Sequence, residues 1–333
     1  MRRALPIVAA VLILALAAYT GYWFYSAHRL RDGLGPWAAA QQKAGYDITW
    51  RSAVVEGFPF AFRLRFADAA LAAERPLPYR LTSPALRLTA APWNLADWHV
   101  TAPQGATLAT QAAASLAMGA VEGTVATANG GARIALQAAG LTGGGLAQGL
   151  AADSADAQVT LPAHPPASHT DPALSLSLTL AQTVLPASPP GFGRKIATLT
   201  LAATLDGRLP DGPLDRTLAA WRDDGGTLVL QTAHLVWDDL DATLAGTLAL
   251  DSDLQPIGAL SATVAHPDAL IDAAVATGML KERFASVIKT VLAALAHPGA
   301  NGQSVVTAPI TLQEGQVFLG PAAVARLPHL TWK

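Results

Sequence analysis

A strict alternation of apolar and polar residues restricts the fold of this chain more than any other feature. From Leu174 to Leu180, leucine alternates with serine or threonine. Successive side chains of a β-strand point to opposite faces, so this run predicts a strand with one apolar and one polar face. Similar runs occur at 198–201, 227–230 and 247–250, separated by clusters of Gly, Pro and Asp. The pattern predicts a mostly β fold, an elongated curved antiparallel sheet of meanders and hairpins with a few packing helices.

The segment from Phe58 to Phe66 predicts the most clearly two-faced strand. Arg63 and Arg65 fall on one face, and large apolar residues occupy every second position on the other. Those apolar residues are Phe58, Phe60, Phe62, Leu64 and Phe66. We expect this apolar face to pack against a core or a ligand while the other face meets water.

Two segments with helical periodicity interrupt the predicted sheet, at 213–223 and at 267–296. In the second, apolar residues recur at the spacing of one helix face. They are Phe284, Val287, Ile288, Val291, Leu292 and Leu295. This stripe predicts a surface that covers the sheet, and Gly278 is a candidate hinge that would let the helix move as a lid.

The N-terminus carries an apolar run of membrane-spanning length. Residues 5–25 hold no charge and follow Arg2 and Arg3. As a helix they would extend about 31 Å, close to the roughly 30 Å hydrocarbon core of a bilayer. The run ends in aromatic residues of the kind found at membrane–water interfaces. We therefore expect a single-pass anchor in the inner membrane, with the bulk of the chain in the periplasm. A signal peptide cleaved after Ala17 is the alternative.

These features divide the chain into three parts. Residues 1–26 are the expected transmembrane anchor, and its first four residues form a cytoplasmic tail. Residues 27–46 are expected to form a helical stalk, interrupted by Gly33, Gly35 and Pro36. Residues 47–333 form the expected periplasmic β-rich domain, in which the Pro and Gly content of 139–172 predicts long loops.

The composition excludes several classes of function. The chain has no cysteine, which excludes disulfides, thiolate metal sites and a cysteine nucleophile. A formal net charge of −2 offers no electrostatic attraction for nucleic acid. Asp residues at 238–241 and 251–253 are interpreted as hairpin turns, because the spacing of a calcium-binding loop is missing.

One catalytic string occurs in the sequence. Ser286 and Lys289 match the S-x-x-K string of penicillin-recognising enzymes, but the companion motifs of those enzymes are absent. An isolated string of this kind is more often an ordinary helix face. We therefore expect a non-enzymatic protein with no catalytic residues, no metal site and no cofactor.

Several short motifs occur in an order that resembles one known family. They are Trp50, Gly57-Phe58-Pro59-Phe60, Ala91-Pro92-Trp93, Gly212-Pro213-Leu214 with Trp221 and Gly225-Gly226, the run from Gly246 to Asp251 with Gln255-Pro256-Ile257-Gly258, and the run from Gln313 to Pro321. As a series over most of 30–330 they resemble domain of unknown function 2125, an uncharacterised family of alphaproteobacterial envelopes. Where that family tends to place a glycine after a tryptophan, this chain has Trp237-Asp238.

The resemblance implies an anchored periplasmic protein of unknown activity and lends no catalytic residues. By a more distant analogy of fold, the expected architecture is similar to that of AsmA-like envelope proteins, whose elongated β-sheets form lipid-lined grooves.

The expected function is to bind or pass on a lipid or another amphiphile in envelope maintenance. A structural scaffold or protein-interaction module of the envelope is the alternative, if helices or a second layer cover the apolar face. The candidate groove residues are Phe58, Phe60, Phe62, Leu64, Phe66, Leu176, Leu178, Phe284, Ile288 and Leu292. Arg63, Arg65, Arg80 and Arg87 form a candidate patch for lipid headgroups, although four solvated arginines on an outer face explain them as simply.

Overall fold

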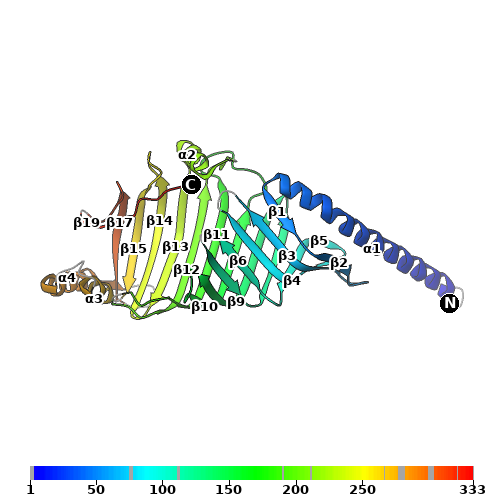
Figure 1. The fold of residues 1–333 in the computed structure, drawn as a ribbon, viewed down its shortest axis with the longest axis horizontal. Coiled ribbons are helices and arrows are strands. Elements are labelled where there is room, and N and C mark those ends of the chain that lie inside the picture. Colours follow the sequence, from blue (N-terminus) through cyan, green and yellow to red (C-terminus); the bar gives the residue numbers. More distant parts are fainter. Residues whose placement is uncertain are drawn as a thin grey trace.

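The computed structural model of the chain is mostly β and contains few helices. It describes residues 4–74, 78–110, 113–189, 191–210, 212–265, 267–276, 282–298, 304–320 and 322–332. Figure 1 shows the strands side by side along the long axis of the molecule, with the first helix projecting beyond one end. The predicted fold class, a large antiparallel sheet with a few helices, is confirmed.

The strands of the described residues belong to one antiparallel sheet. In chain order they are β1 (Tyr46–Thr49), β2 (Ser52–Glu56), β3 (Phe62–Ala73), β4 (Tyr79–Ala91), β5 (Asn94–Ala102), β6 (Ala106–Thr110), β7 (Ala114–Met118), β8 (Val121–Ala128), β9 (Gly131–Gly145), β10 (Ala151–Leu161), β11 (Pro172–Val184), β12 (Lys195–Asp206), β13 (Thr227–Trp237), β14 (Leu240–Leu250), β15 (Pro256–Ala265), β16 (His297–Pro298), β17 (Ser304–Gln313), β18 (Gln316–Leu319) and β19 (Ala322–Arg326). The helices are α1 (Ala4–Lys43), α2 (Leu214–Asp223), α3 (Asp268–Ala276) and α4 (Glu282–Leu295).

The sheet is an up-and-down meander in which strands pair with their neighbours in the sequence. β5 and β6 act as two halves of one bent strand, because both pair with β4. β7 and β8 form a second bent strand along β9. From β9 onward, consecutive strands pair as far as β15, which pairs with β17 across the α3–α4 insertion.

A row of residues with left-handed backbone crosses the N-terminal half of the sheet. Asp68, Gly105, Gly140 and Gln182 have φ values of 48°, 81°, 63° and 51°. A residue in this conformation interrupts the regular alternation, so the faces shift by one position across it while the pairing register on either side stays the same. Leu141 therefore joins the same buried cluster as Ala138. The apolar face of the sheet continues across the bend for this reason.

The predicted strand at 58–66 begins only at Phe62. Phe58 and Phe60 lie instead in a tight loop, closed by the Ala61 N–H, which donates to the Gly57 carbonyl at 3.0 Å. Gly57 has φ of 108°, and a Cβ there would stand 2.6 Å from the Ala61 carbonyl oxygen. The prediction that Phe58 and Phe60 continue the strand face is therefore wrong.

The predicted interruption of the helical stalk at Gly33, Gly35 and Pro36 is also wrong. α1 continues from Ala4 to Lys43 through Gly33, Gly35 and Pro36. One stripe of this helix, formed by Trp23, Ala27, Leu30 and Leu34, packs against the sheet. This contact with the sheet starts at Trp23, inside the expected membrane span, and extends to Leu34. Packing on the sheet therefore stabilises the helix near Gly33, where helix propensity is weak.

Side chains of α1 are described from Val11 onward, so residues 5–10 of the expected span lie outside this part of the structure. Among the described residues, no helix has the length and apolar content needed to cross a membrane. Much of the region 139–172, where loops were predicted, belongs instead to β9 and β10, which pair with each other as antiparallel strands. Glycines near the end of β9 allow strands to approach closely there, so they do not mark a loop.

Candidate functional site

One face of the sheet is apolar from β3 to β17, because leucines and other apolar residues face one another across successive strands. In the centre, Leu178 of β11 lies opposite Leu201 of β12, which lies opposite Ala233 of β13. Ala233 lies opposite Leu244 of β14, which lies opposite Ala262 of β15. Residues directly opposite in antiparallel strands share a face. The alternation seen in the sequence therefore becomes one continuous surface, which we call the apolar face.

Helix α1 closes the apolar face at its N-terminal end. Phe62, Leu64 and Phe66 of β3 have exposures of only 0, 4 and 8 %. The ring of Trp23 stacks on Phe62, and its Nε1–H donates to the Ala61 carbonyl at 3.2 Å. These contacts make a compact core between helix and sheet, so this end of the apolar face has no room for a ligand.

Small residues close the middle of the apolar face. The buried cluster there consists of Ala102, Val121, Ala138, Leu141, Ala152 and Ala155. Leu86 of β4 and Leu180 of β11 pack against this cluster from either side. Members of the cluster stand opposite one another in register, as Ala102 does to Val121 and Ala138 does to Ala155.

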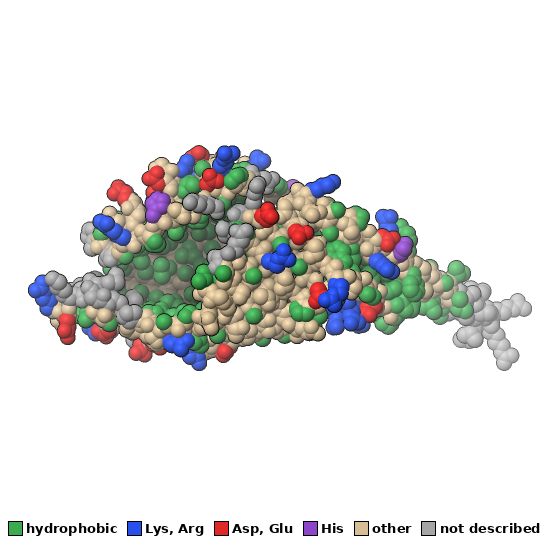
Figure 2. All heavy atoms as spheres, viewed as in Figure 1, with side chains coloured by type: hydrophobic (Ala, Val, Ile, Leu, Met, Phe, Trp, Pro, Cys, Tyr) green, Lys and Arg blue, Asp and Glu red, His purple; other side chains and the backbone are tan. Residues whose placement is uncertain are grey.

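The apolar face is open over the C-terminal strands. Figure 2 shows a hollow lined by hydrophobic side chains in the region of β13 to β15. Apolar residues of these strands are only partly buried. Examples, one from each of β12, β13, β14, β15 and β17, are Leu201, Leu230, Leu244, Leu260 and Ile310. We call this open part of the apolar face the groove.

The groove contains no charged residue at the apolar-face positions of its strands, as the register from β11 to β17 shows. The C-terminal segment crosses its upper rim in Figure 1. It is held there by Gln255, which exchanges two hydrogen bonds with the Leu330 backbone at 2.8 and 3.0 Å. The Trp332 Nε1–H also donates to the Leu254 carbonyl at 2.8 Å.

Helix α2 and two carboxylates stand at the same rim. Trp221 of α2 is buried, and its Nε1–H donates to the Asp206 carbonyl at 2.7 Å. Burial, and secondarily the charge of Asp171, raise the pKa of the Asp206 carboxyl. The backbone N–H groups of Ser168 and then Ala167 donate to Asp171 and lower the pKa of its carboxyl.

The predicted groove residues separate into four groups, three of them in the sheet or beside it and the fourth on α4. Leu176 and Leu178 lie on the partly buried apolar face of β11, beside the groove. Phe62, Leu64 and Phe66 are on the apolar face but are sealed under α1. Phe58 and Phe60 are in the loop before β3, with exposures of 44 and 75 %.

Helix α4 does not lie over the groove. It packs on α3 and contacts β17 at the edge of the sheet, and Figure 1 shows both helices projecting away from the strands. Phe284 is 46 % exposed, and Ile288 and Leu292 are partly buried. These three residues are not brought together with the apolar residues of the sheet centre. The candidate hinge Gly278 lies outside the described residues.

The arginines of the predicted headgroup patch all lie on the outer, polar face of the sheet. Arg65 and Arg87 stand directly opposite each other, and Arg63 is two residues from Arg65 on β3. Arg65 also reaches Glu56, with 3.3 Å between Nη1 and Oε1. Arg80 is seven residues from Arg87 on β4, about 23 Å along a strand. Three of the arginines therefore form a group, and Arg80 stands apart.

A polar depression of about 440 Å³ also lies on the outer face. Side chains from β5, β8, β9, β10 and β11 line it, among them His99, Glu122, Gln137, Asp156 and Gln158. Within the described residues, no three His, Asp or Glu side chains are grouped closely enough to hold a metal ion.

The residues considered for chemistry in the sequence make local structural contacts. The Lys289 ammonium bonds to Asp272 at 2.8 Å, and this hydrogen bond raises the pKa of Lys289, which keeps it a cation rather than a base. Asp251 Oδ1 accepts the backbone N–H groups of Asp253 and Gln255, as expected of a turn.

The Asp that replaces the expected glycine after Trp237 has φ of 49°, a conformation that Asp tolerates and glycine favours. Its carboxylate accepts the Gly193 N–H at 2.6 Å. Asp238 in place of glycine therefore keeps the left-handed backbone conformation and adds a hydrogen bond to Gly193.

The sequence did not single out Leu201, Leu230, Leu244, Leu260 and Ile310 as groove residues. Their alternation is visible in the sequence, but the register that aligns them across strands is not. The sequence therefore predicts which residues of each strand share a face, but not which residues of different strands lie together in the groove.

Comparison with known proteins identifies one family. A family model described as an uncharacterized protein conserved in bacteria, DUF2125, matches residues 23–328. No curated protein and no solved structure matches the chain.

Proposed function

The chain belongs to the DUF2125 family of uncharacterized bacterial proteins, and from its open groove we propose that it binds or passes on a lipid or another amphiphile. The observation that supports this is the in-register apolar face of β11 to β17, which is partly exposed and carries no charge. Each fully buried leucine contributes about 1.5–3 kcal/mol, so an acyl chain gains free energy by covering such a face.

The apolar lining favours a chain-like hydrocarbon over a polar ligand. Carboxylates such as Asp206 lie at the rim, beside α2, where a polar headgroup would remain in water. Ligand sites of this kind combine a largely apolar lining with a few polar groups at fixed positions. The binding is proposed to involve no chemical change of the ligand.

We further propose that the apolar end of α1 enters the inner membrane and that the sheet lies in the periplasm. The apolar side chains between Val11 and Leu16 have exposures of 60–70 %, so the sheet does not cover them. Fractionation of cells tests this proposal. The intact protein should remain with the membrane after alkaline washing, and protease should reach its C-terminus only from the periplasmic side. A mature chain that begins at Ala18 and is released in soluble form would overturn it.

A matched pair of variants on β14 tests the groove. Leu244→Lys places a cation on the apolar face, and Thr247→Lys places the same cation on the outer face of the same strand. A fluorescent fatty acid or phospholipid should bind wild-type protein and Thr247→Lys alike, and Leu244→Lys should bind several-fold more weakly. Circular dichroism and thermal melting of both variants show whether the fold is retained.

Mass spectrometry of the protein purified from cells identifies a native ligand. Co-purified lipid that is depleted in Leu244→Lys supports the groove. If the wild-type protein carries no lipid and binds no amphiphile, the proposal is overturned, and a scaffold or interaction module becomes the better interpretation.

A further inference from the structure

Two loops at the N-terminal end of the sheet expose large aromatic side chains. Phe60, between β2 and β3, is 75 % exposed, and Trp93, between β4 and β5, is 72 % exposed. The backbone next to each of these aromatic residues is held in place. Pro92 is fully buried, and the Gly57–Ala61 turn is closed by its own hydrogen bond. Each loop therefore presents an exposed aromatic ring from a backbone that is held in place.

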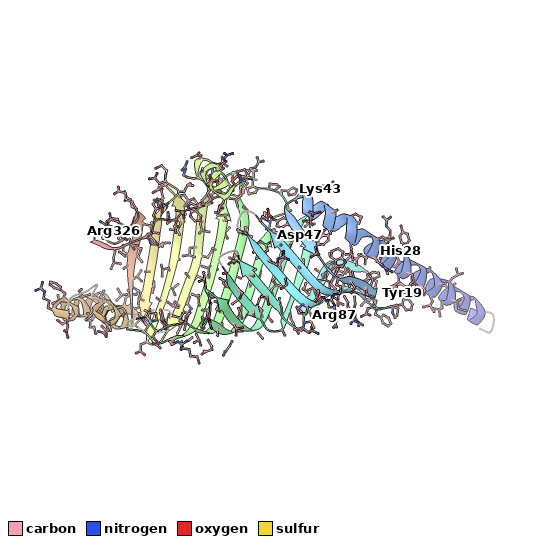
Figure 3. The ribbon with its side chains drawn as sticks, in the orientation of Figure 1. Tyr19, His28, Lys43, Asp47, Arg87 and Arg326 are labelled. Carbon is pink, nitrogen blue, oxygen red and sulfur yellow. The ribbon has the colours of Figure 1, made fainter. Side chains whose placement is uncertain are left out.

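Helix α1 contacts both loops through residues of adjacent helical turns. The Tyr19 hydroxyl donates to the Pro59 carbonyl, and the Tyr22 hydroxyl donates to the Pro92 carbonyl at 2.9 Å. Phe24 of the helix stacks on Phe58, with ring centroids 5.5 Å apart. Figure 3 shows Tyr19 and Arg87 at this end of the molecule, opposite the end that carries Arg326.

The exposed aromatic residues of the helix and the two loops therefore surround one end of the sheet. They are Tyr22, Phe24, Tyr25, Phe58, Phe60 and Trp93, with exposures between 44 and 75 %. We call this group the aromatic collar.

The aromatic collar lies between an apolar and a basic region. On its N-terminal side, Leu16 is six residues before Tyr22, about 9 Å along the helix, and it is 64 % exposed. On its other side, Arg29 lies over the Tyr25 ring at 6.0 Å, and Arg63 lies against Gly57. No acidic residue precedes Asp32 in the chain. An order of hydrocarbon, aromatic rings and basic groups matches the order of layers from the interior to the surface of an anionic bilayer.

We propose that the aromatic collar docks on a lipid bilayer, with Phe60 and Trp93 inserted at the boundary between headgroups and acyl chains. Tyr and Trp rings are favoured at this depth because one part of the ring is apolar and another is polar. The docking does not depend on the proposed groove function, but it rests on the proposed insertion of the apolar end of α1 into the membrane. It would fix the orientation of the sheet on the membrane, since α1 and both loops would contact the bilayer at the same end of the sheet.

Single-cysteine labelling tests the docking, because the chain has no cysteine of its own. Phe60→Cys and Trp93→Cys carry an environment-sensitive fluorophore in the full-length protein, reconstituted in vesicles of phosphatidylcholine with a minority of phosphatidylglycerol. Leu146→Cys is the matched control, because Leu146 is 78 % exposed in the β9–β10 turn, far along the strands from the aromatic collar. Labels at 60 and 93 should emit at shorter wavelength than the label at 146. Lipids brominated high in the acyl chain should quench most of their fluorescence and leave the control unchanged.

Two outcomes overturn the proposal. Labels at 60 and 93 that are as accessible to aqueous iodide as the label at 146 place the collar in water. Protection that rises with the protein-to-lipid ratio, without quenching by brominated lipid, makes the collar an interface between copies of the chain. Circular dichroism of each labelled variant confirms that the fold is intact.

Discussion

The Trp23 ring of α1 stacks on the Phe62 ring of β3, with centroids 5.3 Å apart and planes inclined by 25°. This contact joins the end of the segment expected to lie in a membrane to the first long strand of the sheet. Phe62 is fully buried and Trp23 is 4 % exposed, so each ring completes the core of the other. The N-terminal helix is therefore an integral part of the folded domain rather than a tether beside it.

Removal of the Trp23 ring should destabilise the whole domain. We expect Trp23→Ala to lower the free energy of unfolding by about 3–5 kcal/mol, because it leaves a cavity beside Phe62. Tyr25→Ala is the matched control on the same helix, since Tyr25 is 63 % exposed, and it should change stability by no more than about 0.5 kcal/mol. Urea unfolding followed by circular dichroism measures both. Equal effects would show that α1 does not pack on the sheet.

Truncation should destabilise the domain far more on the buried face of β3 than on its exposed face. Phe62→Ala removes a fully buried ring and should cost about 3–5 kcal/mol of stability. Arg63→Ala, on the exposed face of the next residue, should cost about 0.5 kcal/mol or less. Thermal melting of the two variants gives the comparison. A large loss for Arg63→Ala would mean that the strand is covered on both faces.

Alanine in the middle of α1 should stabilise the helix. A Cβ at Gly33 would meet no atom within 4 Å, and alanine is favoured over glycine in a helix by about 0.5–1 kcal/mol. Gly33→Ala should therefore raise the melting temperature of the full-length protein. Gly226→Ala is the contrasting variant, because a Cβ there would lie 2.2 Å from Trp221 Nε1 and should lower it. A destabilised Gly33→Ala would indicate that the helix bends at this position.

The carboxylates beside α2 should give pH profiles of opposite sign. The raised pKa of Asp206 means that its ionisation costs stability as the pH rises above the unfolded value of about 3.9. Asp206→Asn should therefore gain stability relative to wild type as the pH rises above about 3.9. The lowered pKa of Asp171 contributes stability above that same value, which is lost as the pH falls through the folded pKa. Asp171→Asn should lose stability at neutral pH and approach wild type in acid. Parallel profiles from urea unfolding at each pH would show that these environments are not as described.

The strands of the C-terminal half follow closely from the sequence. Alternation from Leu174 to Leu180 predicts β11, and the shorter runs predict parts of β12, β13 and β14. Neighbouring residues there need only point to opposite faces, which is a local property of the backbone. The same rule failed at Phe58 and Phe60, where Gly57 starts a turn whose positive φ leaves the regular alternation.

The arrangement of the groove could not be predicted from local patterns. The stripe on α4 is amphipathic, but nothing in its spacing says whether it packs on a sheet or on α3. The left-handed backbone at Gly140 and Gln182 changes which residues share a face, and a glutamine in the sequence does not indicate such a conformation. Stacking between Trp23 and Phe62 joins residues that local periodicity treats as separate elements.

The meander makes this part of the sheet nearly one-dimensional, because each strand from β10 to β14 pairs only with its two neighbours in sequence order. Its stability is then close to a sum of hairpin-to-hairpin terms, as in a stack of repeats. Residues in contact on neighbouring strands are close in the sequence, so the loops that close during folding are short. Folding should therefore proceed strand by strand from any formed hairpin, without contacts between distant segments. A family built this way can lengthen or shorten its sheet by whole hairpins, and the length of the apolar surface changes in the same steps.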